Sequence, residues 1–185
     1  MSNSATTKAT IYFPMVSVVD DAKFVSTLAD TVNAVYAEAE NGIFITGYKR
    51  TSPSEIIDLI RHGQLAVMSL DTSQKIAGCI FVKRLSLTHG EFGMMAIDSI
   101  YRGRGFGKQL VTFAEAHCRG QGCTTMRAEL LVPTTFVHPF KERLEAWYLR
   151  MGYMIVKLGQ FDQEYPALAP LLTGPAEYRI LEKVL

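Results

Sequence analysis

Apolar residues recur along the chain at two spacings, one typical of helices and one typical of strands. A short strand is predicted over residues 10–15. After Asp20 and Asp21, which can cap a helix, apolar positions follow one helical face over residues 25–36. The first long helix should therefore run to about Glu40.

The next segment predicts a short helix followed by a group of strands. Ser52-Pro53-Ser54-Glu55 is a capping pattern with proline at the first helical position, and it opens a helix that ends at Gly63. Three strands with intervening turns follow, and they predict an antiparallel meander. The strands are 65–70, 76–85 and 91–98, and the turns are 71–74 and 88–90.

Helices and strands alternate in the second half of the chain. A helix over 104–119 leads into a strand at 124–132, which makes a strand, crossover helix, strand unit. Pro139 begins another helix, closed by Gly152. Strands are predicted at 153–157 and 178–184, and the connection at 158–175 is long enough to suggest an ordered loop over a site. The alternation favours a mixed sheet flanked by helices.

Composition fits one globular domain. Of the 185 residues, 48% are apolar and 20% are charged. Residues 1–8 read as a flexible polar tail and 9–185 as a single domain.

The net charge of +1 gives no field suited to nucleic acid or a membrane surface, and no apolar run could span a bilayer. The three cysteines form no C-x-x-C pair, so we expect reduced thiols, a cytoplasmic location and no metal.

A glycine-rich turn carries the clearest chemical signal. Residues 102–107 lie between a predicted strand and a helix, where glycines let backbone N–H groups approach an anion and the helix dipole adds positive charge. Arg102, Arg104 and Lys108 supply formal charge, which suits a pyrophosphate. No G-K-[ST] follows, and the glycine spacing differs from the dinucleotide fingerprint. A plain turn with solvated arginines is the alternative.

With Arg102, Gly105 and Gly107, this turn matches the pattern [QR]-x-x-G-x-[GA] and resembles the acetyl-CoA motif of the GNAT N-acetyltransferases. The resemblance covers roughly residues 10–157. It implies the GNAT fold, in the α/β (α+β) class, with a mixed, mostly antiparallel sheet of about seven strands flanked by four helices. It also implies acetyl-CoA as co-substrate. The coenzyme-binding residues that it implies are Met95, Ala96, Ile97, Arg102, Gly103, Arg104, Gly105, Phe106, Gly107 and Lys108.

Acetyl transfer to an amine requires a base for the ammonium proton and a proton for the departing thiolate. Glu91 is the candidate base, because it precedes Arg102 by eleven residues, the spacing at which several GNAT family members place a catalytic glutamate. Alternation predicts that it shares a strand face with Met95 and Ile97. Glu129 is a second carboxylate that could steer a cationic substrate. A solvated surface charge is the alternative for both.

The candidate acid is Tyr148. Residues 148–153 resemble the GNAT segment Y-x-[KR]-x-G-[FY], whose tyrosine faces the coenzyme sulfur. The match is incomplete, because Lys141 and Leu144 stand where that family has an asparagine and a small residue. His138 could reach the site, although no carboxylate partner or metal spacing accompanies it.

The acceptor half of the site leaves three functional hypotheses open. Tyr36, Phe44, Tyr48 and the late loop could form a pocket for a small amine, such as an amino acid or a polyamine. A protein or peptide N-acetyltransferase is the second hypothesis, and a non-catalytic acyl-CoA sensor is the third. The presence of both Glu91 and Tyr148 argues against the sensor. The protein should be a monomer or a homodimer.

Overall fold

A seven-stranded sheet runs through the molecule. The computed structural model describes residues 9–70 and 75–185. The strand order is β1-β2-β3-β4-β5-β7-β6, and every neighbouring pair is antiparallel except β4 and β5. This is the mixed, mostly antiparallel sheet expected from the sequence. The strands are β1 (Ala9–Tyr12), β2 (Leu65–Leu70), β3 (Lys75–Arg84), β4 (His89–Ile97), β5 (Thr125–Pro133), β6 (Met154–Gly159) and β7 (Ala176–Val184).

Within the described ranges four longer helices flank this sheet, and the predicted caps begin two of them. The Asp21 carboxylate accepts the backbone N–H groups of Lys23 and Phe24, and the Ser52 hydroxyl accepts that of Glu55. A fifth helix, of one turn, lies in the late connection, where a loop had been expected. The helices are α1 (Ala22–Ala39), α2 (Pro53–Arg61), α3 (Phe106–Gly120), α4 (Pro139–Arg150) and α5 (Phe161–Glu164), with 3₁₀ turns at Val16–Asp20, Ser99–Tyr101 and Ala169–Leu171.

The predicted meander and crossover unit are both present. Strands β2, β3 and β4 pair in sequence, and β4, α3 and β5 form the strand, crossover helix, strand unit. Most predicted boundaries are within two residues of the observed ones. The predicted tail at 1–8 and turn at 71–74 lie outside the described residues.

Each face of the sheet carries its own apolar core. One core contains the buried faces of α1 and α2, and the other contains those of α3 and α4. Strand β2 shows the alternation directly, since Leu65 and Val67 belong to the first core and Ala66 and Met68 to the second. None of the helices in the described ranges has the length and apolarity that a bilayer crossing requires.

A β-bulge in β4 contradicts the predicted alternation. Met94 has a positive φ of 42°, and the pairing of β3 with β4 shifts register there. Phe92 packs in the α3 and α4 core together with Met95, so the extra residue changes which side chains share a face. Glu91, next to Phe92, therefore lies on the face opposite Met95 and Ile97. The prediction that the three share a face is wrong.

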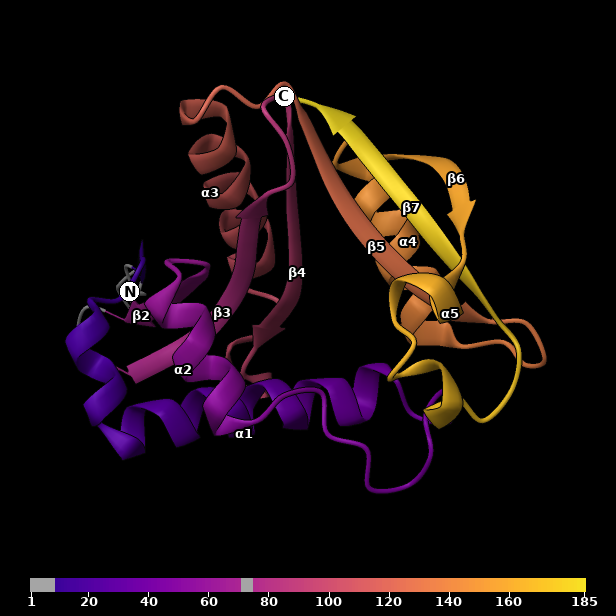
Figure 1. Ribbon diagram of the computed structural model, residues 1–185, viewed down its shortest axis with the longest axis horizontal. Helices are drawn as coiled ribbons and strands as arrows, with labels where there is room; N and C mark the ends of the chain where they lie inside the picture. The colour runs from indigo at the N-terminus through magenta and orange to yellow at the C-terminus, as the bar shows by residue number, and fades with distance from the viewer. Residues whose placement is uncertain (1–8, 71–74) are drawn as a thin grey trace, which may run out of the picture.

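Strands β4 and β5 separate soon after they pair. Their pairing comprises three residue pairs, from His89 with Thr125 to Glu91 with Arg127. Beyond Glu91 the two strands diverge, as Figure 1 shows, with α1 crossing below the opening. The backbone of β4 after the bulge consequently has no strand partner on its β5 side.

Candidate active site

A cavity of about 190 Å³ occupies the divergence between β4 and β5. Residues from both faces of the sheet line it: Tyr36 and Phe81 come from the α1 and α2 side, and Phe92, Leu144 and Tyr148 from the α3 and α4 side. The cavity thus connects the two faces through the sheet. The late connection closes it on one side through Phe161, Tyr165 and Leu168.

Glu91 lies in this cavity and is the last residue of β4 that pairs with β5. It is 7% exposed, and its carboxylate forms ion pairs with Lys83 Nζ at 3.2 Å and Arg127 Nε at 3.5 Å. Burial raises the pKa of the Glu91 carboxyl, and the charge of Glu129 raises it further, while Lys83 and Arg127 oppose the shift. A carboxylate with a raised pKa binds a proton more readily, as a general base must.

Glu129, the second predicted carboxylate, also lines the cavity, from β5. Its oxygens accept a hydrogen bond from Arg127 at 2.7 Å and one from the Tyr165 hydroxyl at 2.6 Å. Arg127 also contacts Glu164 at 3.0 Å. The late connection is therefore tied to the strand that carries Glu129, which fixes the wall of the cavity.

Tyr148 reaches the cavity from α4. Its ring is 6% exposed and packs against Phe92 and Tyr153, with ring centroids 5.9 and 5.8 Å away. Burial raises the pKa of the Tyr148 hydroxyl above its ordinary value, so the group stays protonated at neutral pH. The hydroxyl has no hydrogen-bond partner among residues 9–70 and 75–185. It is thus a free proton donor.

The predicted phosphate loop lines a second hollow that adjoins the cavity. Met95 and Leu144 line both, so the two spaces are neighbours. Gly103 and Gly105 have φ values of 76° and 78°, a conformation that favours glycine, and a Cβ at either position would meet nothing within 4 Å. No side chain caps the N-terminus of α3 at Gly105. Its first N–H groups are open to an anion, so the loop fits a phosphate group.

Most of the other predicted coenzyme residues surround this hollow. Ile97, Arg102, Phe106, Gly107 and Lys108 line it. Arg102 is held by Glu38 of α1, with its Nη1 2.7 Å from the carboxylate, and the guanidinium of Arg104 lies over the Tyr101 ring. The side chain of Ala96 is buried in the opposite core and lines neither space.

Three of the predicted acceptor residues form one wall of the cavity. Tyr36, Phe44 and Tyr48 all line it, and the rings of Phe44 and Tyr48 stack with centroids 4.2 Å apart. His138 does not line it. That residue precedes the first turn of α4, and its Nδ1 is buried without a hydrogen-bond partner among the described residues. Within the same ranges, no group of three His, Cys, Asp or Glu side chains is arranged to hold a metal ion.

The structure adds three charged residues that sequence reasoning did not place in the site. Glu40, Arg50 and Lys141 all line the cavity. Lys141 could have been found, because it precedes Leu144 by three residues and Tyr148 by seven and so shares their helical face. Arg50 follows a loop of irregular structure, where no periodicity predicts which way a side chain points.

A family model identifies the family of this chain. Residues 61–155, just over half of the chain, match the model described as "Acetyltransferase (GNAT) domain". No curated protein sequence matches. Similar folds include an aminoglycoside 6'-N-acetyltransferase complexed with coenzyme A, with a TM-score of 0.67, 14% identity and 96% of each chain covered.

Two further solved structures share the fold. The NatC complex bound to Gag peptide and CoA has a TM-score of 0.64 at 16% identity, and 96% of this chain and 99% of that chain are covered. N-acetylglutamate synthase from Neisseria gonorrhoeae, complexed with coenzyme A and N-acetyl-glutamate, has a TM-score of 0.61 at 16% identity, with 96% and 35% covered. At these identities the likeness concerns the fold.

Proposed function

Because this chain belongs to the GNAT acetyltransferase family, we propose that it transfers the acetyl group of acetyl-CoA to a primary amine of a small molecule. One observation carries the proposal. The glycine-rich loop at 102–107 lines a hollow that adjoins, at Met95 and Leu144, a cavity with a buried carboxylate at the divergence of β4 and β5. The two substrates can therefore meet inside the sheet, and the amine can attack the thioester directly in a ternary complex.

The proposed coenzyme site begins at the loop. The backbone N–H groups at the start of α3, with Lys108 beside them in the lining and Arg104 one residue before Gly105, would bind the pyrophosphate. The unpaired edge of β4 at Met95 and Ile97 would hold the pantetheine arm by backbone hydrogen bonds. When bound, acetyl-CoA supplies a thioester whose carbonyl carbon accepts the amine. Structures of several GNAT-fold proteins contain the coenzyme, which supports this assignment.

Glu91 would act as the base. An alkylamine resembles lysine, whose pKa is about 10.4, so its ammonium form must lose a proton before it attacks. The Glu91 carboxylate lines the cavity and has a raised pKa, and it can accept that proton directly or through a water molecule. Glu129, whose Oε1 lies 2.7 Å from Nη2 of Arg127, would attract the cationic acceptor.

Tyr148 would act as the acid. Its hydroxyl is protonated, has no hydrogen-bond partner among the described residues and belongs to the wall of the cavity on the coenzyme side. A proton donated there would neutralise the departing thiolate.

A peptide acceptor is the second candidate, because one protein of similar fold was solved with a bound peptide. The late connection favours a small molecule here, since Phe161, Tyr165 and Leu168 cover the cavity and Tyr165 is bonded to Glu129. An extended chain would have to displace that cover.

We also propose that the protein acts in the cytoplasm. Its three cysteines, Cys79, Cys118 and Cys123, are free and buried. Burial raises the pKa of the Cys79 thiol to about 12 and that of Cys118 to about 11. Such thiols are unreactive and persist in a reducing compartment.

The test is an acetyl-transfer assay on the purified chain. Acetyl-CoA is mixed with separate panels of small primary amines and of peptides, and the free thiol of the released coenzyme is measured. We expect thiol release with small amines. Coenzyme binding without turnover on any acceptor would contradict the enzyme and favour the sensor, and turnover with peptides alone would favour the second candidate.

A further inference from the structure

The charged groups of the cavity divide into two clusters. One contains Glu91 and Glu129, whose carboxylates are paired with Lys83 and Arg127. The other lies on the α1 and α4 side and contains Glu40, Arg50 and Lys141, all of which line the cavity. The second cluster takes no part in the proposed chemistry.

In this second cluster one ion pair forms, and the other charged atoms have no ion-pair or hydrogen-bond partner among the described residues. Lys141, 4% exposed, has its Nζ 3.4 Å from Glu40 Oε1, while Glu40 Oε2 is buried without a hydrogen-bond partner in the described part of the chain. The guanidinium of Arg50 lies over the Tyr36 ring, 5.4 Å from its centroid. No carboxylate of residues 9–70 or 75–185 lies within ion-pair distance of Arg50.

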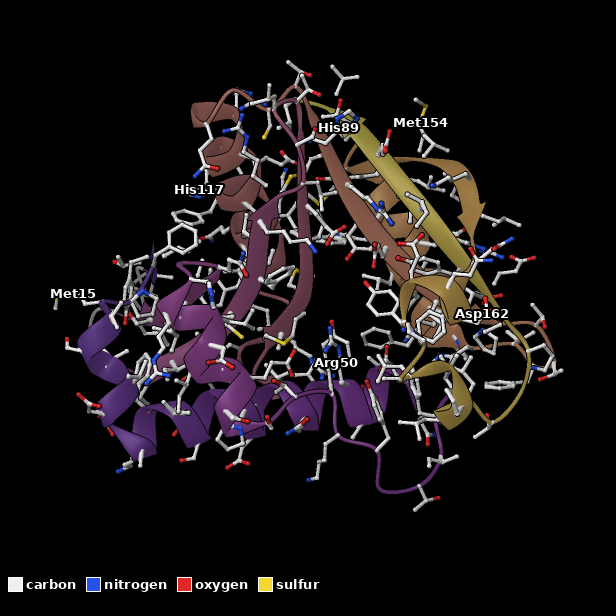
Figure 2. The ribbon with its side chains drawn as sticks, in the orientation of Figure 1. Met15, Arg50, His89, His117, Met154 and Asp162 are labelled. Carbon is white, nitrogen blue, oxygen red and sulfur yellow. The ribbon has the colours of Figure 1, made fainter. Side chains whose placement is uncertain are left out.

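Charge balance follows from these contacts. Among the side chains of this cluster that line the cavity, two cations accompany one carboxylate, and Glu55, whose charge also acts on Arg50, lies outside that lining. A half-buried guanidinium without an anion loses hydration and gains no ion pair in return, which is unfavourable. Figure 2 shows the Arg50 side chain between α1 and the diverging strands β4 and β5, where a ligand in the cavity would contact it.

We propose that Arg50 binds a carboxylate of the acceptor, so that the substrate class is an amino acid rather than a polyamine or a neutral amine. This inference rests on the proposed function. The planar guanidinium offers two parallel N–H groups that match the two oxygens of a carboxylate. Lys141, on the neighbouring helix α4, adds a second positive charge to the same wall.

The arrangement also discriminates against other amines. An amino acid presents an amine and a carboxylate, and the cavity presents Glu91 and Glu129 in one cluster and Arg50 in the other. A polyamine would place a second ammonium group against Arg50, and like charges in a space of low dielectric repel each other. A neutral amine would leave Arg50 unpaired.

The experiment compares matched acceptors. Acetylation by the wild-type chain is measured with several amino acids, with their carboxamides and with the corresponding amines that lack the carboxylate. Values of kcat/KM are expressed per unprotonated amine, because the carboxyl group changes the amine pKa. We expect the amino acids to exceed their carboxamides by about 10- to 100-fold, the range for hydrogen bonds between charged groups.

Variants of Arg50 test whether this residue causes the preference for amino acids over carboxamides. Arg50→Met should raise KM for amino acids about 10- to 100-fold and should lower kcat/KM for the carboxamides much less, and Arg50→Lys should restore part of the loss. Lys49→Met is the matched control, because Lys49 is the exposed neighbouring cation and does not line the cavity. Lys49→Met should leave kcat/KM unchanged for both amino acids and carboxamides.

The outcomes separate this inference from the proposed function. If carboxamides or polyamines are acetylated as well as amino acids, or if Arg50→Met weakens both acceptor classes equally, the carboxylate site is wrong and the acetyltransferase stands. If no amine of any class is acetylated, the proposed function fails. Turnover of carboxamides by Arg50→Met also serves as the check that this variant is folded.

Discussion

At the scale of single residues, the pKa of the Glu91 carboxyl is set by groups that act in opposite directions. Burial and the charge of Glu129 favour its protonated form, whereas Lys83 and Arg127 favour the carboxylate, and the first two prevail. A base with a raised pKa loses its function at a higher pH than an ordinary glutamate, because the protonated form cannot accept a proton. The acid limb of the wild-type pH profile should therefore lie above pH 4.5.

Glu91→Gln tests this role. We expect kcat to fall by about 100-fold or more, the usual contribution of general base catalysis, with a larger loss near neutral pH, where free amine is scarce, than at high pH, where the amine has already lost its proton. The acid limb assigned to Glu91 should vanish from the profile of kcat/KM against pH. Glu142→Gln, an exposed glutamate on α4, is the control and should be silent. A stronger effect from Glu129→Gln would move the role to Glu129.

Tyr148→Phe tests the acid. The change removes one hydroxyl without altering the packing of the ring, so the affinity for acetyl-CoA should stay within about twofold while kcat falls by about 100-fold. Pre-steady-state thiol release and coenzyme titration measure the two quantities. Tyr153→Phe is the matched control, because that hydroxyl donates to Glu115 at 2.8 Å in the core and should affect stability instead of turnover. An unchanged rate would make Tyr148 a packing residue.

Sequence reasoning found the residues of the site that belong to a local pattern. Glu91, Glu129 and Tyr148 stand at strand or helix positions of known spacing, and all three line the cavity. His138 was included because of its place in the chain alone, and it lies elsewhere. Arg50 was missed, because its position depends on a loop that packs against Tyr36 over a long-range contact.

At the scale of elements, β4 carries both the predictable and the unpredictable parts of the fold. Its place in the meander follows from alternating apolar residues and flanking turns, and the structure confirms it. The bulge at Met94 has no such signal, because the residue is neither glycine nor asparagine and yet has a positive φ. Met94 is buried in the core beside α1 and α2, and the extra residue of the bulge is the reason why a rule based on period two assigned Glu91 to the wrong face.

The turn into α3 supplies a prediction at the same scale. Gly105→Ala forces an alanine into a left-handed conformation at a cost of about 1–2 kcal/mol and places a methyl group at the proposed phosphate site. We expect the dissociation constant of acetyl-CoA to rise at least tenfold, measured by calorimetry. Gly120→Ala, at the other end of α3 with open space around it and no positive φ, is the control and should leave binding unchanged. Equal affinities would contradict a phosphate role for the turn.

At the scale of the whole molecule, the order of the strands was the feature that the sequence could not supply. A final strand was predicted, but its insertion between β5 and β6 depends on pairing between residues far apart in the chain, such as Thr125 with Val184. That insertion places Tyr178 of β7 beneath the late connection, in contact with Tyr165 and Phe161. The cover of the cavity therefore depends on the position of β7 in the strand order.

The divergence of β4 and β5 has a consequence for kinetics. The coenzyme hollow and the acceptor wall lie toward opposite faces of the sheet, so each product can leave by the face at which its own precursor entered. Coenzyme A should therefore inhibit competitively against acetyl-CoA and non-competitively against the amine, with intersecting lines in initial-rate plots. Parallel lines would indicate an acetylated enzyme instead. Because the sheet opens in its middle, acetyl-CoA and the amine would enter from opposite faces, and we expect them to bind in either order.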